Sequence, residues 1–425
     1  MPSTRILHVD GDSFFASCEI ARDPSLKDYP IWVGGGRNGD GIVIAANRLA
    51  KKFGVTTGMA CYEAKQKCPT GILCPPHYED YRDISQHMFH ILEQYSPVLV
   101  PISIDEGFLD LTGMEHTVWR HSSAKAYVEG LLQHITNEVK IPVSAGLASS
   151  SRLAKLATDA GKPGFLEIQE GQEKEFLSDR PLRELSGVGE KLEASFKQIG
   201  AVTFGDLAKM PAMFVHKKFG IWGQEVWMLA NGLWREPLIL EEKQRTTISS
   251  STTLPEDEND YQAVLIFLLS ESARLIGQLR REGLMPKEVG LVVRYNDFSE
   301  KGGNFKLNQP QFRTAIVGQV LEDMFNRTIK TQHKPIRQIR ITMQNLYPFQ
   351  PQDTLWGQGT DSKVASLDRA ADALNAKIGR NVIKTGTQYA LEHLAKPMSN
   401  QKAKCPFVPQ REMVERLGLL EAKTN

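Results

Sequence analysis

Two adjacent carboxylates, Asp105 and Glu106, lie inside the segment VPISIDEGFLDL (residues 100–111), whose other residues are mostly apolar and typical of strands. Burying one unpaired carboxylate is unfavourable, and burying two neighbours is worse because they repel each other. The chain must therefore fold so that this pair either faces water or lies beside positive charge. The apolar alternation breaks at the pair, which predicts the tip of a hairpin between two buried strands.

A second acidic position follows the first strand expected along the chain. In RILHVDGDSFFASCE, the apolar residues 6–9 are followed by Asp10 and Asp12. The order strand, long insertion, hairpin, helix, strand predicts a ferredoxin-like half-sheet that carries an inserted subdomain. If the first strand neighbours the hairpin, Asp10 converges with Asp105 and Glu106. Asp12 is expected to be a turn or supporting residue.

Converging carboxylates can be stabilised by a cation, and hard oxygen ligands suit Mg²⁺. A two-metal site of this kind lowers the barrier to nucleotidyl transfer. The plainer interpretation is that Asp105 and Glu106 are turn residues facing water, because turns favour Asp. The residue pattern alone leaves both interpretations open.

Length and composition favour a multidomain α+β protein. A chain of 425 residues exceeds one ordinary core and predicts three or four domains. No apolar run is long enough to cross a bilayer and no signal-peptide core is present, so we expect a cytoplasmic monomer without membrane association. The five scattered cysteines argue against a disulfide framework or a structural zinc site. The net charge of +1 is uninformative, although residues 243–348 hold fifteen Lys or Arg against eleven Asp or Glu.

Further along the chain, the patterns predict a succession of distinct segments. A hairpin is expected around the Gly/Asn/Asp cluster of residues 31–46, and helices over 79–96 and 122–139. Short helices with Gly-rich turns follow residue 165. The second α+β region has predicted strands over 245–254, 288–295, 304–308 and 336–346, and predicted helices over 261–281 and 314–326. The tail is Gln- and Pro-rich and then has one expected helix over 362–379.

Five sequence blocks occur in order: HVDGDSFFASCE, AANRLAKKFGV, GMACYEAKQKCP, SIDEGFLDL and LAKLATDAGKPGF. Together they resemble the Y-family, or translesion, DNA polymerases, which include bacterial DNA polymerase IV and the catalytic subunit of DNA polymerase V. The resemblance implies a right hand with an added domain. Its parts would be the palm (1–22 and 78–166), fingers (23–77), helix-hairpin-helix thumb (167–234), linker (235–242), little finger (243–348) and tail (349–425).

Carried over by position, the resemblance assigns roles at the carboxylate cluster. Asp10 and Asp105 match metal ligands, Gly11 offers its carbonyl as a main-chain ligand, and Glu106 matches the catalytic carboxylate beside the primer terminus. Two Mg²⁺ ions are implied, with deoxynucleoside triphosphates and primer–template DNA as substrates. Phe15 matches the aromatic steric gate, whose flat ring leaves no room for a ribose 2′-hydroxyl.

Other residues are expected around the nucleotide. Phe14 borders it, although core packing is the simpler role for that side chain. Lys162, in GKPG, and Lys51 match cations that contact the triphosphate. Arg48 stands where polymerase IV enzymes carry a Tyr, so it either binds phosphate or points into solvent. The segments ASCE and VIAAN favour the polymerase V branch, whereas the little-finger region favours polymerase IV.

Candidate DNA contacts lie in the thumb and the little finger. LSGVGEKL (residues 185–192) resembles a helix-hairpin-helix, in which Gly187 and Gly189 let the backbone approach a phosphate and Lys191 adds charge. An ordinary tight turn is the alternative. In the little finger, Ser249, Ser251 and Arg337 are expected on one sheet face along the DNA backbone, with a plain solvent-facing surface as the alternative.

The tail contains QPQDTLW, in which Gln352, Leu355 and Trp356 resemble the peptide by which bacterial polymerases dock on the sliding clamp. Exposed Leu and Trp are unfavourable unless a partner pocket receives them. A chance match of so short a pattern is the alternative.

The sequence therefore indicates a low-fidelity, template-directed DNA polymerase for translesion synthesis, without an apparent proofreading domain. Small residues in the fingers, Ala46, Gly58 and Ala60, would leave the templating pocket roomy. One rival is a non-catalytic scaffold relative, which would have lost the acidic residues. The other is a nucleotidyl cyclase, which would need neither a helix-hairpin-helix nor a clamp peptide.

Overall fold

A computed structural model describes residues 4–35, 41–114, 123–235 and 245–349, with positions 238, 370–374, 377 and 386 in addition. The chain divides into two compact units, whose boundary falls within residues 236–244. Each unit is described by itself. Most of the linker expected over residues 235–242 lies outside the described residues.

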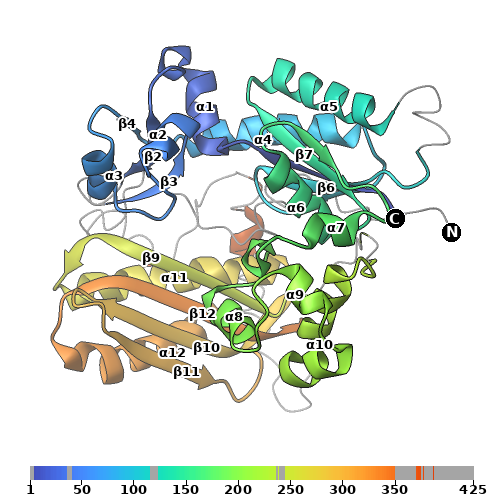
Figure 1. Ribbon diagram of the computed structural model, residues 1–425. Coiled ribbons are helices and arrows are strands. Elements are labelled where there is room, and N and C mark those ends of the chain that lie inside the picture. Colours follow the sequence, from blue (N-terminus) through green and yellow to red (C-terminus); the bar gives the residue numbers. More distant parts are fainter. Residues whose placement is uncertain are drawn as a thin grey trace. The chain divides into compact units, whose positions relative to one another are not determined.

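A five-stranded sheet organises the first unit (Figure 1). Its spatial order is β5 (Leu99–Pro101), β6 (Glu106–Asp110), β1 (Ile6–Gly11), β7 (Val143–Ala148) and β8 (Phe165–Glu167). The helices α4 (Tyr78–Glu93) and α5 (Ala124–Val139) connect β1 to β5 and β6 to β7. The order β7-β1-β6-β5 with two helical crossovers is the predicted ferredoxin-like plan, and β8 extends it at one edge. β5 is only half-buried, not buried as expected.

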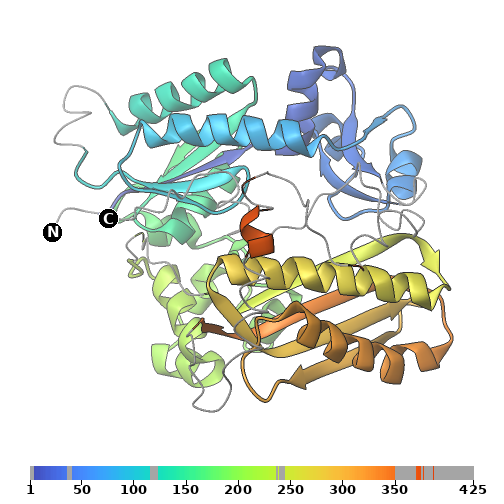
Figure 2. The same ribbon diagram turned by 180° about the vertical axis from the view of Figure 1, so that it is seen from behind.

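The two faces of this sheet bury alternate residues of β1. Leu7 and Val9 join the core under α4 and α5, which run side by side along one face (Figure 2). Ile6 and the ring of His8 point to the opposite face, which α6 (Ser151–Gly161) covers. This period of two fixes which side chains of β1 can meet those of α6.

A small subdomain is inserted between β1 and α4, at the position expected for the fingers. Its sheet has the order β3 (Ile42–Ala46), β2 (Ile31–Gly35), β4 (Ile72–Cys74). The predicted pairing of β2 with β3 is confirmed as antiparallel, whereas the turn 36–40 lies outside the described residues. The other elements are α1 (Phe14–Arg22), a 3₁₀ turn (Pro24–Leu26), α2 (Arg48–Lys52) and α3 (Cys61–Lys67).

Short helices follow β8, as predicted. They are α7 (Glu173–Leu177), a 3₁₀ turn (Leu182–Glu184), α8 (Glu190–Lys197), α9 (Phe204–Ala208) and α10 (Ala212–Ala230). Their buried side chains, including Phe196 and Phe204, share one core with α6. α10 is interrupted at Gly220, which has a positive φ of 66°.

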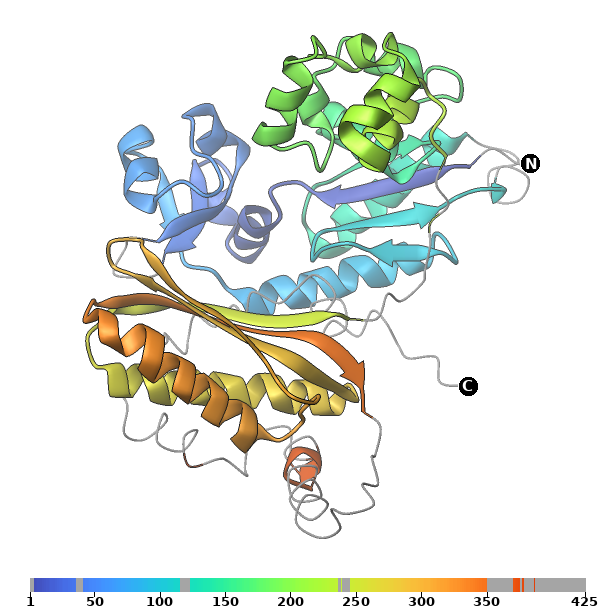
Figure 3. The ribbon, with the colours of Figure 1, turned by 90° about the horizontal axis from the view of Figure 1, so that it is seen from below.

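The second unit is a four-stranded antiparallel sheet with the order β11 (Glu300–Lys306), β10 (Leu284–Tyr295), β12 (Ile336–Pro348), β9 (Thr247–Glu258). The helices α11 (Tyr261–Arg281) and α12 (Thr314–Met324) both lie on one side of it (Figure 3). A π-helical turn (Phe325–Ile329) and a 3₁₀ turn (Lys330–Gln332) follow α12. α11 is long and apolar enough to cross a membrane, but 67% of that window is buried inside the protein.

Some helices and strands begin or end at other residues than the sequence pattern predicts, because packing outweighs the local pattern there. The strand expected at 304–308 is found at Glu300–Lys306, where it pairs with β10. The helix expected over 79–96 ends at Glu93, and β10 starts four residues earlier than expected. Within the tail, residues 370–374 and 377 are helical, in agreement with the helix predicted over 362–379, and the rest of that segment lies outside the described residues.

Gly146, on β7, provides a test of how closely α6 packs on the sheet. A Cβ at this position would lie 2.3 Å from the carbonyl oxygen of Ala154 and from the amide nitrogen of Thr158. We expect Gly146→Ala to lower the urea midpoint of unfolding, because backbone atoms cannot give way cheaply. The control Gly130→Ala lies on the exposed side of α5 with no atom within 4 Å, and should raise stability by roughly 0.5–1 kcal/mol. Equal midpoints for the two variants would contradict this packing.

Candidate active site

Three carboxylates meet at one end of β1. Asp10 is paired directly with Glu106 across the β1–β6 ladder, so both side chains lie on the α6 face with His8. Asp105 ends the turn before β6, and its carbonyl accepts a 2.8 Å hydrogen bond from the amide of Gly11. Ligand atoms of His8, Asp10 and Glu106 all lie within 4.8 Å of one another. The strand register therefore brings together residues that are about a hundred positions apart.

Cationic side chains from α6 and the loop after it contact two of these carboxylates. Lys162 Nζ lies 2.6 Å from Asp10 Oδ1, and Lys155 Nζ contacts Glu106 Oε2. The ring of His8 lies 3.2 Å from the same Glu106 oxygen. Burial raises the pKa of Glu106, but the hydrogen bonds from His8 and Lys155 outweigh it and lower the pKa to about 2. Glu106 is therefore ionised at neutral pH.

Of the three carboxylates, Asp105 has the fewest groups that stabilise its negative charge. Its Oδ1 accepts a 2.5 Å hydrogen bond from Ser103, which comes from the same turn. Burial, with the charges of Asp10 and Glu106, outweighs that bond and raises the pKa of Asp105 to about 6. Burial also raises the pKa of Asp10, although Lys162 opposes this shift. The site thus holds more negative charge than its own lysines stabilise.

The donor set fits a divalent cation that prefers oxygen ligands. Asp10, Asp105 and Glu106 could supply carboxylate oxygens, and the carbonyl of Gly11 could supply a main-chain ligand. A side chain at Gly11 would crowd this point, because a Cβ there would lie 2.9 Å from Phe14 and 3.4 Å from Asp105. The raised pKa of Asp105 is the physical sign that an additional positive charge would stabilise the cluster.

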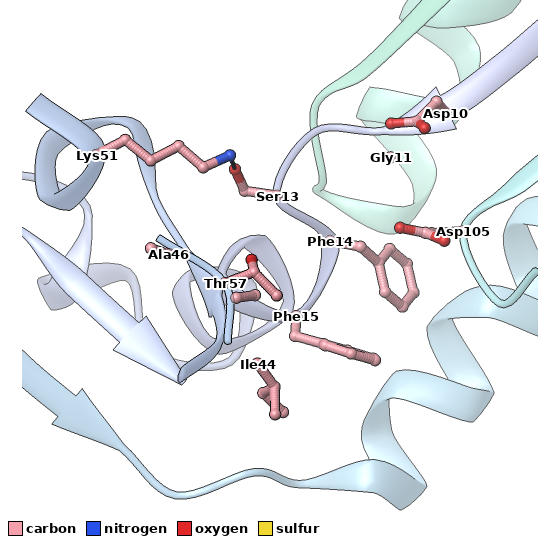
Figure 4. A pocket seen from close by; sticks show the side chains of 11 residues that line it. Asp10, Gly11, Ser13, Phe14, Phe15, Ile44, Ala46, Lys51, Thr57 and Asp105 are labelled. Atoms are coloured by element: carbon pink, nitrogen blue, oxygen red, sulfur yellow. Dashed lines mark hydrogen bonds between the residues drawn. The ribbon is translucent and has the colours of Figure 1, made fainter. Parts of the chain in front are cut away.

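A pocket beside Asp10 and Asp105 extends toward the inserted subdomain (Figure 4). Phe14 and Phe15 from α1 form one side of it, and Lys51 donates a 2.9 Å hydrogen bond to Ser13 at its edge. Phe14 is 3% exposed and belongs to the core, and it also lines the pocket, so both of its expected roles stay predictions. The remaining lining residues are Gly11, Ile44, Ala45, Ala46 and Thr57.

Some residues expected around the nucleotide or in the templating pocket do not line this pocket. Arg48 is exposed on the first turn of α2 and is not among the lining residues. Both of its expected roles, phosphate binding and a solvent-facing position, stay predictions. Gly58 and Ala60 also lie outside the lining, whereas Ala46 lies in it. Lys162 is held against Asp10 and does not line the pocket.

The segment expected to form the helix-hairpin-helix runs from the 3₁₀ turn Leu182–Glu184 through a tight turn into α8. Gly187 has a φ of 98°, and a Cβ there would lie 3.0 Å from the Trp222 ring, so both conformation and space require glycine. Gly189 is the N-cap of α8, and Lys191 is exposed in the first turn of that helix. The backbone at Gly189 is thus accessible at a helix start.

In the second unit, two of the three residues expected along the DNA, Ser249 and Ser251, belong to a regular ladder. Ser249 and Ser251 are exposed on the side of the sheet opposite the buried Ile248, but the residue paired with Ser251 is Arg340. The register of β12 against β9 shifts between Ile336 and Gln338, so the ladder pairing skips Arg337. Arg337 instead lies 3.8 Å from Asp257 and over the ring of Phe298. Simple alternation could not reveal a bulge.

The sequence analysis did not single out His8 or Lys155. His8 lies two residues before Asp10 on a strand, so its side chain is on the same face as that of Asp10. Lys155 lies one helical turn before Thr158, whose side chain contacts His8. The expected clamp residues Gln352, Leu355 and Trp356 lie outside the described residues.

Comparisons with known proteins cover most of the chain. Residues 9–159 match the profile of the impB/mucB/samB family, and residues 245–358 match the profile of that family's C-terminal domain. The chain is 30% identical to DNA polymerase IV of Dehalococcoides mccartyi strain CBDB1, over 93% of this chain and 100% of that protein. It is 32% identical to DNA polymerase IV 1 of Halalkalibacterium halodurans, over 90% of this chain and 92% of that protein.

Solved structures show the same fold. A chimeric Y-family DNA polymerase superposes with a TM-score of 0.68 at 24% identity, covering 81% of this chain and 99% of that one. An insertion ternary complex of Dbh DNA polymerase superposes with a TM-score of 0.57 at 23% identity, covering 81% of this chain and 100% of that one.

Proposed function

Because the chain belongs to the impB/mucB/samB family of Y-family DNA polymerases, we propose that its carboxylate cluster is the active site of a template-directed DNA polymerase. The protein is a DNA-directed DNA polymerase of the translesion class, a low-fidelity enzyme that takes part in DNA repair. This identity removes the nucleotidyl cyclase and the non-catalytic scaffold as alternatives. The relatives named above are polymerase IV enzymes, which favours that branch over polymerase V.

The observation that supports this site best is the register that pairs Asp10 with Glu106 beside Asp105. Y-family polymerases use divalent metal ions, and we assign Asp10, Asp105, Glu106 and the Gly11 carbonyl as the residues that would hold two Mg²⁺. When bound, these ions would activate the primer 3′-hydroxyl and stabilise the pyrophosphate leaving group. Glu106, ionised and held by His8 and Lys155, would lie beside the primer terminus.

The pocket, together with a cation beside it, suits a deoxynucleoside triphosphate. Lys51 and Lys162 offer two cations for the phosphates, and burial together with the charge of Lys162 lowers the pKa of Lys51. An anionic triphosphate would relieve this repulsion between two ammonium groups. Lys162 would have to leave Asp10 as that carboxylate takes up its metal. The apolar side of the pocket, with Phe15, would receive the sugar and exclude a 2′-hydroxyl.

Primer–template DNA is the macromolecular substrate. The backbone at Gly187 and Gly189, with Lys191, would contact phosphates without reading sequence. Ser249 and Ser251 are proposed to do the same on the open face of the second unit, with Arg340 as their neighbour. These contacts would hold the duplex and explain tolerance of template sequence.

Asp105→Ala tests the catalytic assignment. Losing one carboxylate from the cluster should reduce primer extension by roughly 10³-fold or more, because metal-assisted charge stabilisation contributes several kcal/mol to such a reaction. The measurement is single-turnover extension on undamaged and abasic templates. Asp83→Ala removes an exposed acid from α4 and should extend like wild type. Extension by Asp105→Ala at the wild-type rate would refute the site.

The tail segment is proposed to dock on the sliding clamp through Gln352, Leu355 and Trp356, on the strength of its sequence pattern. Replacing Leu355 and Trp356 together by Ala should abolish binding to purified clamp, because it removes both apolar anchors. Surface plasmon resonance measures the affinity, and extension without clamp is the control, which should not change. Undiminished clamp binding by the double variant would refute the assignment.

A further inference from the structure

Glu19 is a buried carboxylate that the proposed reaction does not use. It lies on α1, one helical turn after Phe15, and is 3% exposed. Its partners are the hydroxyl of Tyr81, the ring nitrogen Nδ1 of His77 at 2.9 Å and the guanidinium of Arg22 at 3.7 Å. A carboxylate can be buried only when it is paired and hydrogen-bonded, and Glu19 in turn fixes the position of the groups that donate to it.

Tyr81 is what Glu19 holds, and Tyr81 supports Phe15. The Tyr81 side chain is fully buried on α4, and its ring stacks under that of Phe15 with centroids 4.8 Å apart and planes 29° apart. Tyr78 meets both rings edge-on, at 6.3 Å from Phe15 and 5.7 Å from Tyr81. Burial, together with the hydrogen bond to Glu19, raises the pKa of Tyr81, so its hydroxyl remains a donor.

These contacts join α1 to α4 at two points. Phe15 and Glu19 belong to α1, and Tyr81 from α4 touches the first through its ring and the second through its hydroxyl. The Phe15 ring cannot move away from the pocket unless Tyr81 moves, and Tyr81 cannot move without leaving the Glu19 carboxylate short of a donor. Ring stacking alone would permit sliding, whereas the hydroxyl fixes the position along the plane.

We infer that Tyr81, anchored by Glu19, is a positioning residue that fixes the Phe15 ring and thereby sets how strongly the enzyme rejects ribonucleotides. This inference rests on the proposed role of Phe15 as the steric gate. To exclude a ribose 2′-hydroxyl by shape, the Phe15 ring must keep its position to within a fraction of an ångström. If Tyr81 could slide along the plane of the Phe15 ring, it would not hold the ring that rigidly.

Tyr81→Phe removes only the hydroxyl and keeps the stacked ring. The measured quantity is the ratio of kcat/KM for a deoxynucleotide to that for the matching ribonucleotide. We expect this ratio to fall about tenfold, because the lost restraint is worth about one hydrogen bond. The kcat/KM for the deoxynucleotide itself should stay near the wild-type value. A residue that only supports the fold would lower both values together and leave the ratio unchanged.

Variants of Glu19 test the same hydrogen bond by changing its acceptor, and they remain informative if Tyr81→Phe fails to fold. Glu19→Ala removes the acceptor and should lower the ratio as Tyr81→Phe does, whereas Glu19→Gln keeps an acceptor oxygen and should restore it to within about twofold of wild type. The control Tyr127→Phe loses a 2.8 Å hydrogen bond to the Tyr95 carbonyl and should leave the ratio unchanged.

Phe15→Ala separates this inference from the gate itself. If Phe15→Ala admits ribonucleotides while Tyr81→Phe and Glu19→Ala both keep the wild-type ratio, the gate stands and the positioning role of Tyr81 is refuted. If Phe15→Ala also keeps the wild-type ratio, Phe15 is not the gate, and the inference falls with it.

Discussion

Repulsion among three carboxylates at the end of β1 is the constraint on which this protein's functional site depends. The ladder that aligns Asp10 with Glu106 is fixed by the buried alternation of Leu7 and Val9, so the core itself forces the acids together. Lys155 and Lys162 offset part of that repulsion. Burial first, and then the charges of Asp10 and Glu106, raise the pKa of Asp105. A cation that binds among these three carboxylates would therefore stabilise the folded protein.

The lysines also explain how one site can be stable both with and without its cations. Lys155 contacts Glu106, and Lys162 contacts Asp10 and, at 3.3 Å, the exposed Asp159. Among the described residues, neither ammonium contacts Asp105 by hydrogen bond or ion pair. Lys162 lies directly after α6, at the C-cap position of that helix. Lys155 lies within α6, where His8 and Thr158 complete a network that orients Glu106 in either state.

Much of this was readable from the sequence, and the failures have definite physical causes. The break in alternation at Asp105 located the hairpin, and the order of elements gave the ferredoxin-like plan, because strand and helix periods are local properties. The network of His8, Lys155 and Thr158 was missed because it depends on which helix covers which face. The register shift beside Arg337 was not foreseen, because alternation assumes a regular ladder. The contact between Phe15 and Tyr81 joins residues 66 positions apart, which no local pattern records.

The most direct test of the account is the binding of Mn²⁺ to the full chain with a deoxynucleoside triphosphate present, followed by electron paramagnetic resonance of the free ion. At about pH 8, wild type should bind Mn²⁺ more tightly than Asp105→Asn, and Asp83→Asn should match wild type. Because the pKa of Asp105 is raised to about 6, its carboxyl is protonated below that pH, so wild-type binding should weaken at about pH 5. Equal binding by wild type and Asp105→Asn at about pH 8 would contradict the claim that these carboxylates meet to hold divalent ions.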